Sequence, residues 1–196
     1  MDAPILTIVG AQVALGPLDS AQLPWYHQWV NDFAVVRTLA RSPVPMTIEQ
    51  TQAWLARHAG SEQVVAFTVY DAATNRPIGN AALLDIHDQY RSAMFAILIG
   101  ESSYRGRGYG TETTRLMLEY AFMVVGLHSV WLAVAEYNVA GRRAYEKAGF
   151  REVGRRREAI WMGGTYWDEI TMDCLVTEFT SPVLAQPVAP GGAPRR

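Results

Sequence analysis

The stretch Arg105-Gly106-Arg107-Gly108-Tyr109-Gly110-Thr111 follows an apolar run and precedes a segment with helical periodicity. Glycine lets a backbone come close to a ligand. The first N–H groups of a helix, aided by the helix dipole, form a site for anions. The two arginines add bidentate donors for phosphate. The stretch therefore predicts a loop between a buried strand and a helix that holds a pyrophosphate.

Two familiar phosphate-binding loops fit this stretch poorly. A P-loop ends in Gly-Lys-Ser/Thr, and the stretch contains no lysine. A dinucleotide fingerprint needs three glycines in the pattern GxGxxG, but Thr111 stands at the third position, and the acidic residue expected about 20 positions later is not convincing, since Glu136 comes later still. A dinucleotide-binding oxidoreductase is therefore disfavoured, whereas a plain turn from strand to helix stays open for the loop taken alone.

Apolar periodicity on both sides of the loop predicts the neighbouring elements. Strands are expected at residues 13–18, 64–70, 78–86, 93–99, 130–135, 153–162 and 167–175. Helices are expected from Asp19 toward Asp32, from Thr47 to Gly60 with a capping box, over residues 111–125, and from Asn138 to Gly149, the last with Ala140, Ala144, Tyr145 and Ala148 on its inner face. This order indicates an α/β protein with one mixed sheet.

A second motif follows the next expected strand, Asn138-Val-Ala-Gly-Arg-Arg-Ala-Tyr145-Glu-Lys-Ala-Gly149-Phe150. Together with Tyr104-Arg-Gly-Arg-Gly108-Tyr-Gly110-Thr-Glu112, it closely resembles the GNAT superfamily of acyl-CoA-dependent N-acetyltransferases. The chain looks most like the branch that contains RimJ/RimL-type protein N-terminal acetyltransferases and polyamine acetyltransferases. The resemblance covers roughly residues 13–175. It implies a central, mostly antiparallel sheet, flanked by helices, whose strands splay apart at the cofactor.

The resemblance also implies the binding mode of acetyl-CoA. The glycine loop would hold the pyrophosphate, the pantetheine arm would lie where the strands ending near Ile99 and beginning near Val130 splay apart, and backbone N–H groups near residues 98–100 would hold the thioester carbonyl. Asn138 would contact the cofactor arm. The implied cofactor-binding residues are Ile99, Arg105, Gly106, Arg107, Gly108, Tyr109, Gly110, Thr111, Asn138, Arg142 and Arg143.

The implied reaction is direct attack of a neutral amine on the thioester, with Tyr145 donating a proton to the leaving thiolate. Taken without the motif, Tyr145 reads as a core residue of an amphipathic helix. Many relatives carry a glutamate base near Met94, where this strand is apolar throughout. We rank Asp168 and Glu101 first as replacement bases, and each also has a surface or capping interpretation. The segment Asp85, His87 and Asp88 is a further candidate.

Charge patterning bears on the substrate. The net charge is −2, so the chain as a whole is no polycation built to coat nucleic acid. Residues 105–157 hold ten Arg or Lys and five Asp or Glu, whereas the remainder holds seven basic and fourteen acidic residues. This asymmetry favours an anionic cofactor on one part and a cationic amine acceptor near the other. A random patchwork of solvated charges is the alternative.

Length and composition bound the organisation. The 196 residues, 49% of them hydrophobic, suit one domain over residues 1–178 and a flexible tail rich in proline, alanine and glycine over 179–196. One cysteine excludes an intrachain disulfide and a cysteine-based zinc site, and no histidine spacing suggests a metal. We expect a cytoplasmic enzyme without a membrane segment and consider a homodimer reasonable. A larger donor such as succinyl-CoA, or a non-catalytic acyl-CoA-binding module, stays open.

Overall fold

The sequence forms eight strands and five α-helices in the described part of the chain. In the computed structural model, residues 3–39 and 43–180 are described. The strands are β1 (Ile8–Val9), β2 (Val13–Pro17), β3 (Val65–Asp71), β4 (Pro77–His87), β5 (Ser92–Ile99), β6 (Ser129–Ala135), β7 (Arg151–Met162) and β8 (Thr165–Leu175). The helices are α1 (Leu23–Asn31), α2 (Phe33–Val36), α3 (Ile48–Ala59), α4 (Tyr109–Glu119) and α5 (Val139–Ala148).

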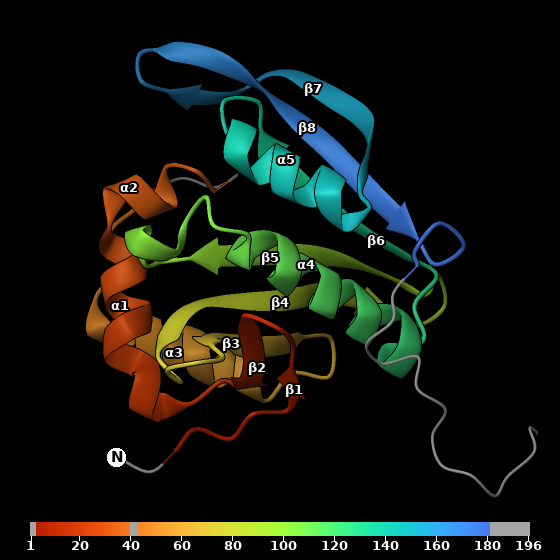
Figure 1. Ribbon diagram of the computed structural model, residues 1–196. Helices are drawn as coiled ribbons and strands as arrows, with labels where there is room; N and C mark the ends of the chain where they lie inside the picture. The colour runs from red at the N-terminus through yellow and green to blue at the C-terminus, as the bar shows by residue number, and fades with distance from the viewer. Residues whose placement is uncertain (1–2, 40–42, 181–196) are drawn as a thin grey trace, which may run out of the picture.

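The strands form a single mixed sheet in the order β1-β2-β3-β4-β5-β6-β8-β7. Every neighbouring pair is antiparallel except β5 and β6, which are parallel. Figure 1 shows β7 and β8 as a long hairpin at one end of this sheet. The hairpin turns at Gly163 and Gly164, both with positive φ, as the glycine pair predicted. The expected mixed α/β architecture is confirmed.

The parallel contact between β5 and β6 is short. Only Ser92, Ala93 and Met94 pair with β6, opposite Ser129, Val130 and Trp131. On its other edge β5 stays paired with β4 as far as Ile99, which lies opposite Gly79. The last five residues of β5 are therefore paired on one edge and unpaired on the other, which confirms the predicted splay.

Helices cover both faces of the sheet and bury two separate cores. Figure 1 shows α4 and α5 on the near face, with α3 behind the sheet. The larger core lies between the sheet and α4, and it includes Phe95, Met117 and Ile170. The smaller core joins Tyr26 and Trp29 of α1 to Leu98 of β5. The even-numbered residues of β5 thus face α1, and the odd-numbered residues face α4 and α5.

Several sequence predictions need correction. The helix expected from Thr111 begins at Tyr109, because Gly108 in the left-handed region serves as its N-cap. Ala140, expected on the inner face of α5, is exposed, because the helix turns this position toward solvent in its first turn. Asp19 caps a 3₁₀ turn, and α1 begins four residues later.

Packing near residue 179 bears on the predicted boundary between the domain and the tail. Phe179, assigned to the tail, contacts Phe122 with ring centroids 5.3 Å apart and packs against the larger core. The folded part therefore extends at least to this residue. The proline-rich run after residue 180 lies outside the described residues.

Candidate active site

The candidate site begins at the unpaired edge of β5. The N–H of Gly100 donates to the carbonyl of Ile78 on β4, at 2.9 Å. Antiparallel strands alternate between residues that bond to the partner and residues that point away. Leu98 therefore also bonds to β4, and the N–H groups of Ile97 and Ile99 face the side of β6, where no strand pairs with them. Of the thioester donors expected near residues 98–100, only the N–H of Ile99 points into the splay.

The glycine loop follows directly. Gly106 has a φ of 72° and Gly108 a φ of 95°, a region that side chains with a Cβ rarely adopt. Both glycines are exposed, and no atom lies within 4 Å of a Cβ built at Gly106. The next residues start α4, whose first N–H groups have no partner within the helix. The loop and the helix start thus present backbone donors to a free surface, which fits an anionic group such as pyrophosphate.

Arg105 fixes the shape of this loop. Its guanidinium donates to the carbonyls of Ile99 at 3.0 Å, Gly100 at 3.0 Å and Ala34 at 3.3 Å. The side chain therefore ties the loop to the end of β5 and to α2. Its predicted contact with phosphate stays a prediction, since these carbonyls already engage the guanidinium. Arg107 is exposed, and among the described residues it donates only to the Ser103 carbonyl, which leaves more of its donor capacity toward solvent.

The first turn of α4 is anchored by two carboxylates. The Tyr109 hydroxyl donates to Asp71 Oδ2 at 2.9 Å. Burial acts to raise the pKa of Asp71, but hydrogen bonds from Thr74, Tyr109 and Ala73 outweigh it and hold that pKa below its usual value. Glu112 accepts the N–H groups of Ala11 and Gln12, at 2.5 and 3.0 Å, in the turn between β1 and β2. Tyr109 is thus a buried anchor, and its neighbours Gly110 and Thr111 are half-buried.

Asn138 stands where β6 passes into α5. Its Oδ1 accepts the N–H of Gly141 at 2.9 Å and caps the helix, as predicted. Its Nδ2 donates to the Thr38 carbonyl at 3.0 Å, and the hydroxyl of Tyr137 donates to the Arg37 carbonyl at 2.6 Å. Asn138 therefore joins α5 to the segment after α2, and its contact with the cofactor stays a prediction.

Arg142 and Arg143 follow on the first turns of α5. Arg142 reaches Glu152 of β7 at 3.4 Å, and its Nε is buried without a hydrogen-bond partner among residues 3–39 and 43–180. Arg143 is exposed. An anion on this part of α5 would find two cations.

Tyr145 lies at the point where β5 and β6 separate. Its ring meets Phe95 edge-on, with centroids 6.3 Å apart, and Phe95 is the first residue of β5 without a partner in β6. Burial raises the pKa of Tyr145 to about 12. Within the described ranges its hydroxyl has no hydrogen-bond partner. The group is therefore protonated at neutral pH and available as a proton donor.

Glu101 lies beside α1 at the end of β5. Its Oε1 accepts the indole N–H of Trp29 at 3.1 Å, and its Oε2 accepts Arg76 at 2.8 Å. A Cβ on Gly100 would lie 2.1 Å from Trp29, so only glycine lets the indole rest on the chain here. The Glu101 side chain is 16% exposed. This carboxylate is held two residues from Ile99 and still reaches solvent.

Asp168 lies on the opposite face. Its Oδ1 accepts the N–H of Glu158 at 2.9 Å, and its Oδ2 pairs with Arg155 at 3.1 Å. The N–H of Glu158, followed by Arg155, lowers the pKa of Asp168. The register of β7 shifts between Arg156 and Ile160, so this carboxylate holds a bulge. Both oxygens are engaged, which favours a positioning role over proton transfer.

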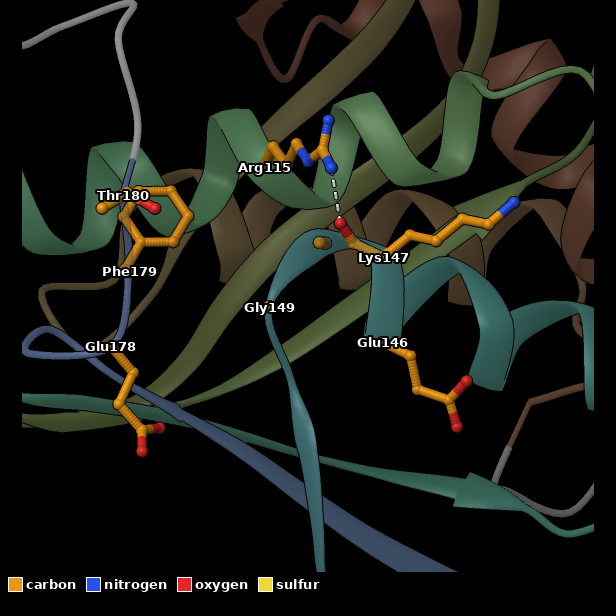
Figure 2. Close-up of a pocket in the computed structure, with 8 residues that line it drawn as sticks. Arg115, Glu146, Lys147, Gly149, Glu178, Phe179 and Thr180 are labelled. Atoms are coloured by element: carbon orange, nitrogen blue, oxygen red, sulfur yellow. Dashed lines mark hydrogen bonds between the residues drawn. The ribbon is translucent and has the colours of Figure 1, made fainter.

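Two hollows lie away from these residues. One of about 240 Å³ lies among α4, the end of α5 and residues 178–180, and Figure 2 shows Arg115 of α4 donating to the Lys147 carbonyl there. The other, of about 360 Å³, is lined by Ile5, Tyr70 and residues 17–20. None of the predicted site residues lines either hollow.

Two further features are absent from the described residues 3–39 and 43–180. No group of three or more His, Cys, Asp or Glu side chains in these ranges is placed to hold a metal ion. The helices in the same ranges include none that is long and apolar enough to cross a membrane.

The structure gathers most predicted residues around one feature, the unpaired edge of β5. Ile99 and the loop lie at its end, and Tyr145 lies at its start. Sequence reasoning missed residues that hold this arrangement, chiefly Asp71 and Arg76. Asp71 had a usable signal, because it opens a turn rich in Thr and Asn. Arg76 had none, since its partner Glu101 is 25 residues away.

Comparison with known proteins gives relatives across the whole fold. Spermidine N(1)-acetyltransferase of Escherichia coli K12 is 28% identical over 179 residues, which are 91% of this chain and 92% of the relative. The crystal structure of spermidine N-acetyltransferase from Vibrio cholerae in complex with CoA and spermine has a TM-score of 0.79 at 27% identity, covering 86% of this chain and 98% of the other. The mouse alpha/beta-tubulin-N-acetyltransferase 9 is 27% identical over 87% of this chain and 71% of its own length.

The acetyltransferase (GNAT) domain family matches residues 12–151, which contain the splayed strands, the glycine loop and Tyr145. The relatives named above are N-acetyltransferases, and one was solved with CoA bound. The chain belongs to the GNAT family of acetyltransferases and is an N-acetyltransferase with acetyl-CoA as its acetyl donor.

Proposed function

We propose that the primary amine to which this enzyme transfers the acetyl group belongs to a polyamine such as spermidine. The observation that carries the proposal is the similarity to spermidine acetyltransferases over almost the full length of both chains. The charge pattern supports it, because acidic residues are in excess outside residues 105–157. A polyamine is a flexible polycation, and an acidic surround raises the local concentration of such a substrate.

Acetyl-CoA would bind along the unpaired edge of β5. The glycine loop and the start of α4 would hold its pyrophosphate, with Arg107 as the arginine that is freest to reach it. Arg142 and Arg143 would meet the adenosine-side phosphate. Arg105 and Asn138 would keep the loop and α5 in place. The N–H of Ile99 would donate to the thioester carbonyl and stabilise the oxyanion that forms there.

The chemical step needs one proton removed and one supplied. An amine with a pKa of about 10.4 is almost wholly protonated at pH 7, so a base must take its proton before the nitrogen attacks the carbonyl carbon. Glu101 is the carboxylate best placed to take this proton, directly or through water, on the face of the sheet that α1 covers. As the C–S bond breaks, Tyr145 would donate its proton to the sulfur. Asp168 would act by holding the bulge in β7.

A protein amino group is the second candidate acceptor. The tubulin N-acetyltransferase relative favours it, as does the predicted likeness to RimJ/RimL-type enzymes. Membership of that branch, a cytoplasmic location and the boundary of the tail near residue 179 stay predictions. The expected homodimer does too, although exposed Trp131, Trp161 and Tyr166 offer apolar surface on the last three strands.

A thiol-release assay separates the candidates. The purified protein and acetyl-CoA would be mixed with spermidine, spermine, an aminoglycoside or peptides with varied N-termini. We expect the highest kcat/KM with a polyamine. Preference for a peptide would contradict the proposal and favour the protein acceptor. A parallel series with succinyl-CoA tests the larger donor, and binding of acetyl-CoA without turnover of any amine would favour the non-catalytic module.

A further inference from the structure

A second carboxylate faces the splay from the other side. Extending the register of the three β5–β6 pairs places Leu98 level with Ala135, and Ala135 pairs with Glu169 of β8. Parity puts all three side chains on the face of the sheet that α1 covers. The side chain between Glu169 and the splay is only a methyl group. Glu169 therefore lies across the gap from the end of β5, on the same face as Glu101.

Glu169 is well shielded but loosely paired. Its side chain is 16% exposed, and its Oε1 lies 3.3 Å from an Nη of Arg156, which is 68% exposed. An ion pair with so exposed an arginine contributes little, because solvent screens it and the long side chain loses freedom. A cation from outside can therefore take the place of the guanidinium at modest cost.

We propose that Glu169 binds a second ammonium group of the acceptor and that Arg156 occupies this place until the substrate arrives. This inference rests on the proposed polyamine acceptor. The reacting amine would lie between Glu101 and the N–H of Ile99, and the chain of methylene groups would extend from the unpaired end of β5 toward Glu169. The carboxylate then selects amines that carry another positive charge at a distance, and it takes no part in the chemical step.

The test compares a polyamine with a monoamine. Steady-state kinetics with acetyl-CoA would use spermidine and propylamine on the wild-type enzyme and on Glu169→Gln. We expect KM for spermidine to rise roughly tenfold, since a hydrogen bond between charged groups contributes about that factor or more. The kcat for spermidine and the KM for propylamine should change less than about twofold.

Two further variants sharpen the test. Arg156→Gln should lower KM for spermidine, because it removes the internal competitor. Glu178→Gln is the matched control, since Glu178 pairs with Arg151, another β7 arginine that is 68% exposed. Glu178 follows the C-terminal end of β8, and the Glu178→Gln variant should have the kinetic constants of the wild type.

Each other outcome overturns the inference. Equal losses with both amines in Glu169→Gln would assign Glu169 a structural role, and unchanged kinetics would assign it none. A higher KM in Arg156→Gln would mean that the arginine assists binding. If the wild-type enzyme leaves spermidine unacetylated, the proposed acceptor fails together with this inference. If the wild-type enzyme acetylates spermidine and Glu169→Gln has the same KM, the inference about Glu169 fails and the proposed acceptor stands.

Discussion

The two edges of β5 have different partners and different uses. On one edge the strand pairs with β4 from end to end, and this pairing fixes Leu98 and Gly100. On the other edge it pairs with β6 over three residues and then stands free. Backbone groups that a sheet would normally satisfy are left for a ligand on the free edge. The same strand thus provides rigidity through one edge and a binding surface through the other.

The variant with the largest expected effect is Tyr145→Phe, which lies at the start of the free edge of β5. Removing the hydroxyl should lower kcat about 100-fold, as expected for loss of a general acid, while KM for acetyl-CoA stays within about twofold. Stopped-flow or steady-state thiol release measures both. The control is Tyr120→Phe, which removes a hydroxyl at the C-terminal end of α4, away from the glycine loop. Equal kcat values for Tyr145→Phe and the wild type would remove the acid from the mechanism.

Glu101→Gln tests the end of the same strand. The amide keeps a carbonyl for the Trp29 indole but removes the negative charge. We expect kcat to fall at least about tenfold, because the amide cannot accept the proton of the amine.

The matched control for this prediction is Arg76→Gln, which breaks the same ion pair and leaves the carboxylate in place. A base role predicts a large loss only in Glu101→Gln. If both variants lose activity equally, Glu101 holds α1 in position and another group takes the proton.

Gly108→Ala tests the loop at the end of the free edge. A φ of 95° strains alanine by about 1–2 kcal/mol, and relief of that strain moves the start of α4. KM for acetyl-CoA should rise roughly fivefold. Gly164→Ala, at a φ of 81° in the β7–β8 turn, imposes similar strain far from the loop. Both variants should lose stability, and a rise in KM for both would deny the loop its special role.

Thr47→Ala should act on stability alone. Thr47 and Gln50 form the capping box of α3, which packs against β3, away from the free edge of β5. Loss of the cap should lower the free energy of unfolding by about 1 kcal/mol, measured by urea denaturation. The kinetic constants should stay those of the wild type. A change in KM for acetyl-CoA would show that α3 and the free edge of β5 are coupled.

The smallest expected effect is that of alkaline pH on the acid. Tyr145 acts in its protonated form, and burial raises its pKa from 10.0 to about 12. Raising the pKa extends the protonated range, so kcat should show no loss due to this residue between pH 8 and 10. The pH–rate profile of the wild type, compared with Tyr145→Phe, measures it. A decline in that range that Tyr145→Phe abolishes would contradict the raised pKa.

The sequence predicted the elements that local patterns control. Glycines, caps and alternating apolar residues placed strands β2 to β8, and the two motifs located the splay and Tyr145. Contacts between distant segments were beyond its reach. The sequence around Arg105 does not indicate that its guanidinium binds carbonyls of β5 and α2. The contact of Asp168 with the bulge depends on the register of β7, which the sequence does not predict. Ala140 shows that helical spacing predicts which residues are buried only in the turns of a helix that pack against another element.

Amide hydrogen exchange along β5 tests the central claim most directly. In the free enzyme the N–H groups of Ala96 and Leu98 should exchange slowly, because they bond to β4, whereas those of Ile97 and Ile99 should exchange faster. Saturating acetyl-CoA should slow Ile99 and Ile97 strongly and leave Ala96 and Leu98 unchanged. If acetyl-CoA binds while Ile97 and Ile99 keep their exchange rates, the free edge of β5 is not the cofactor site.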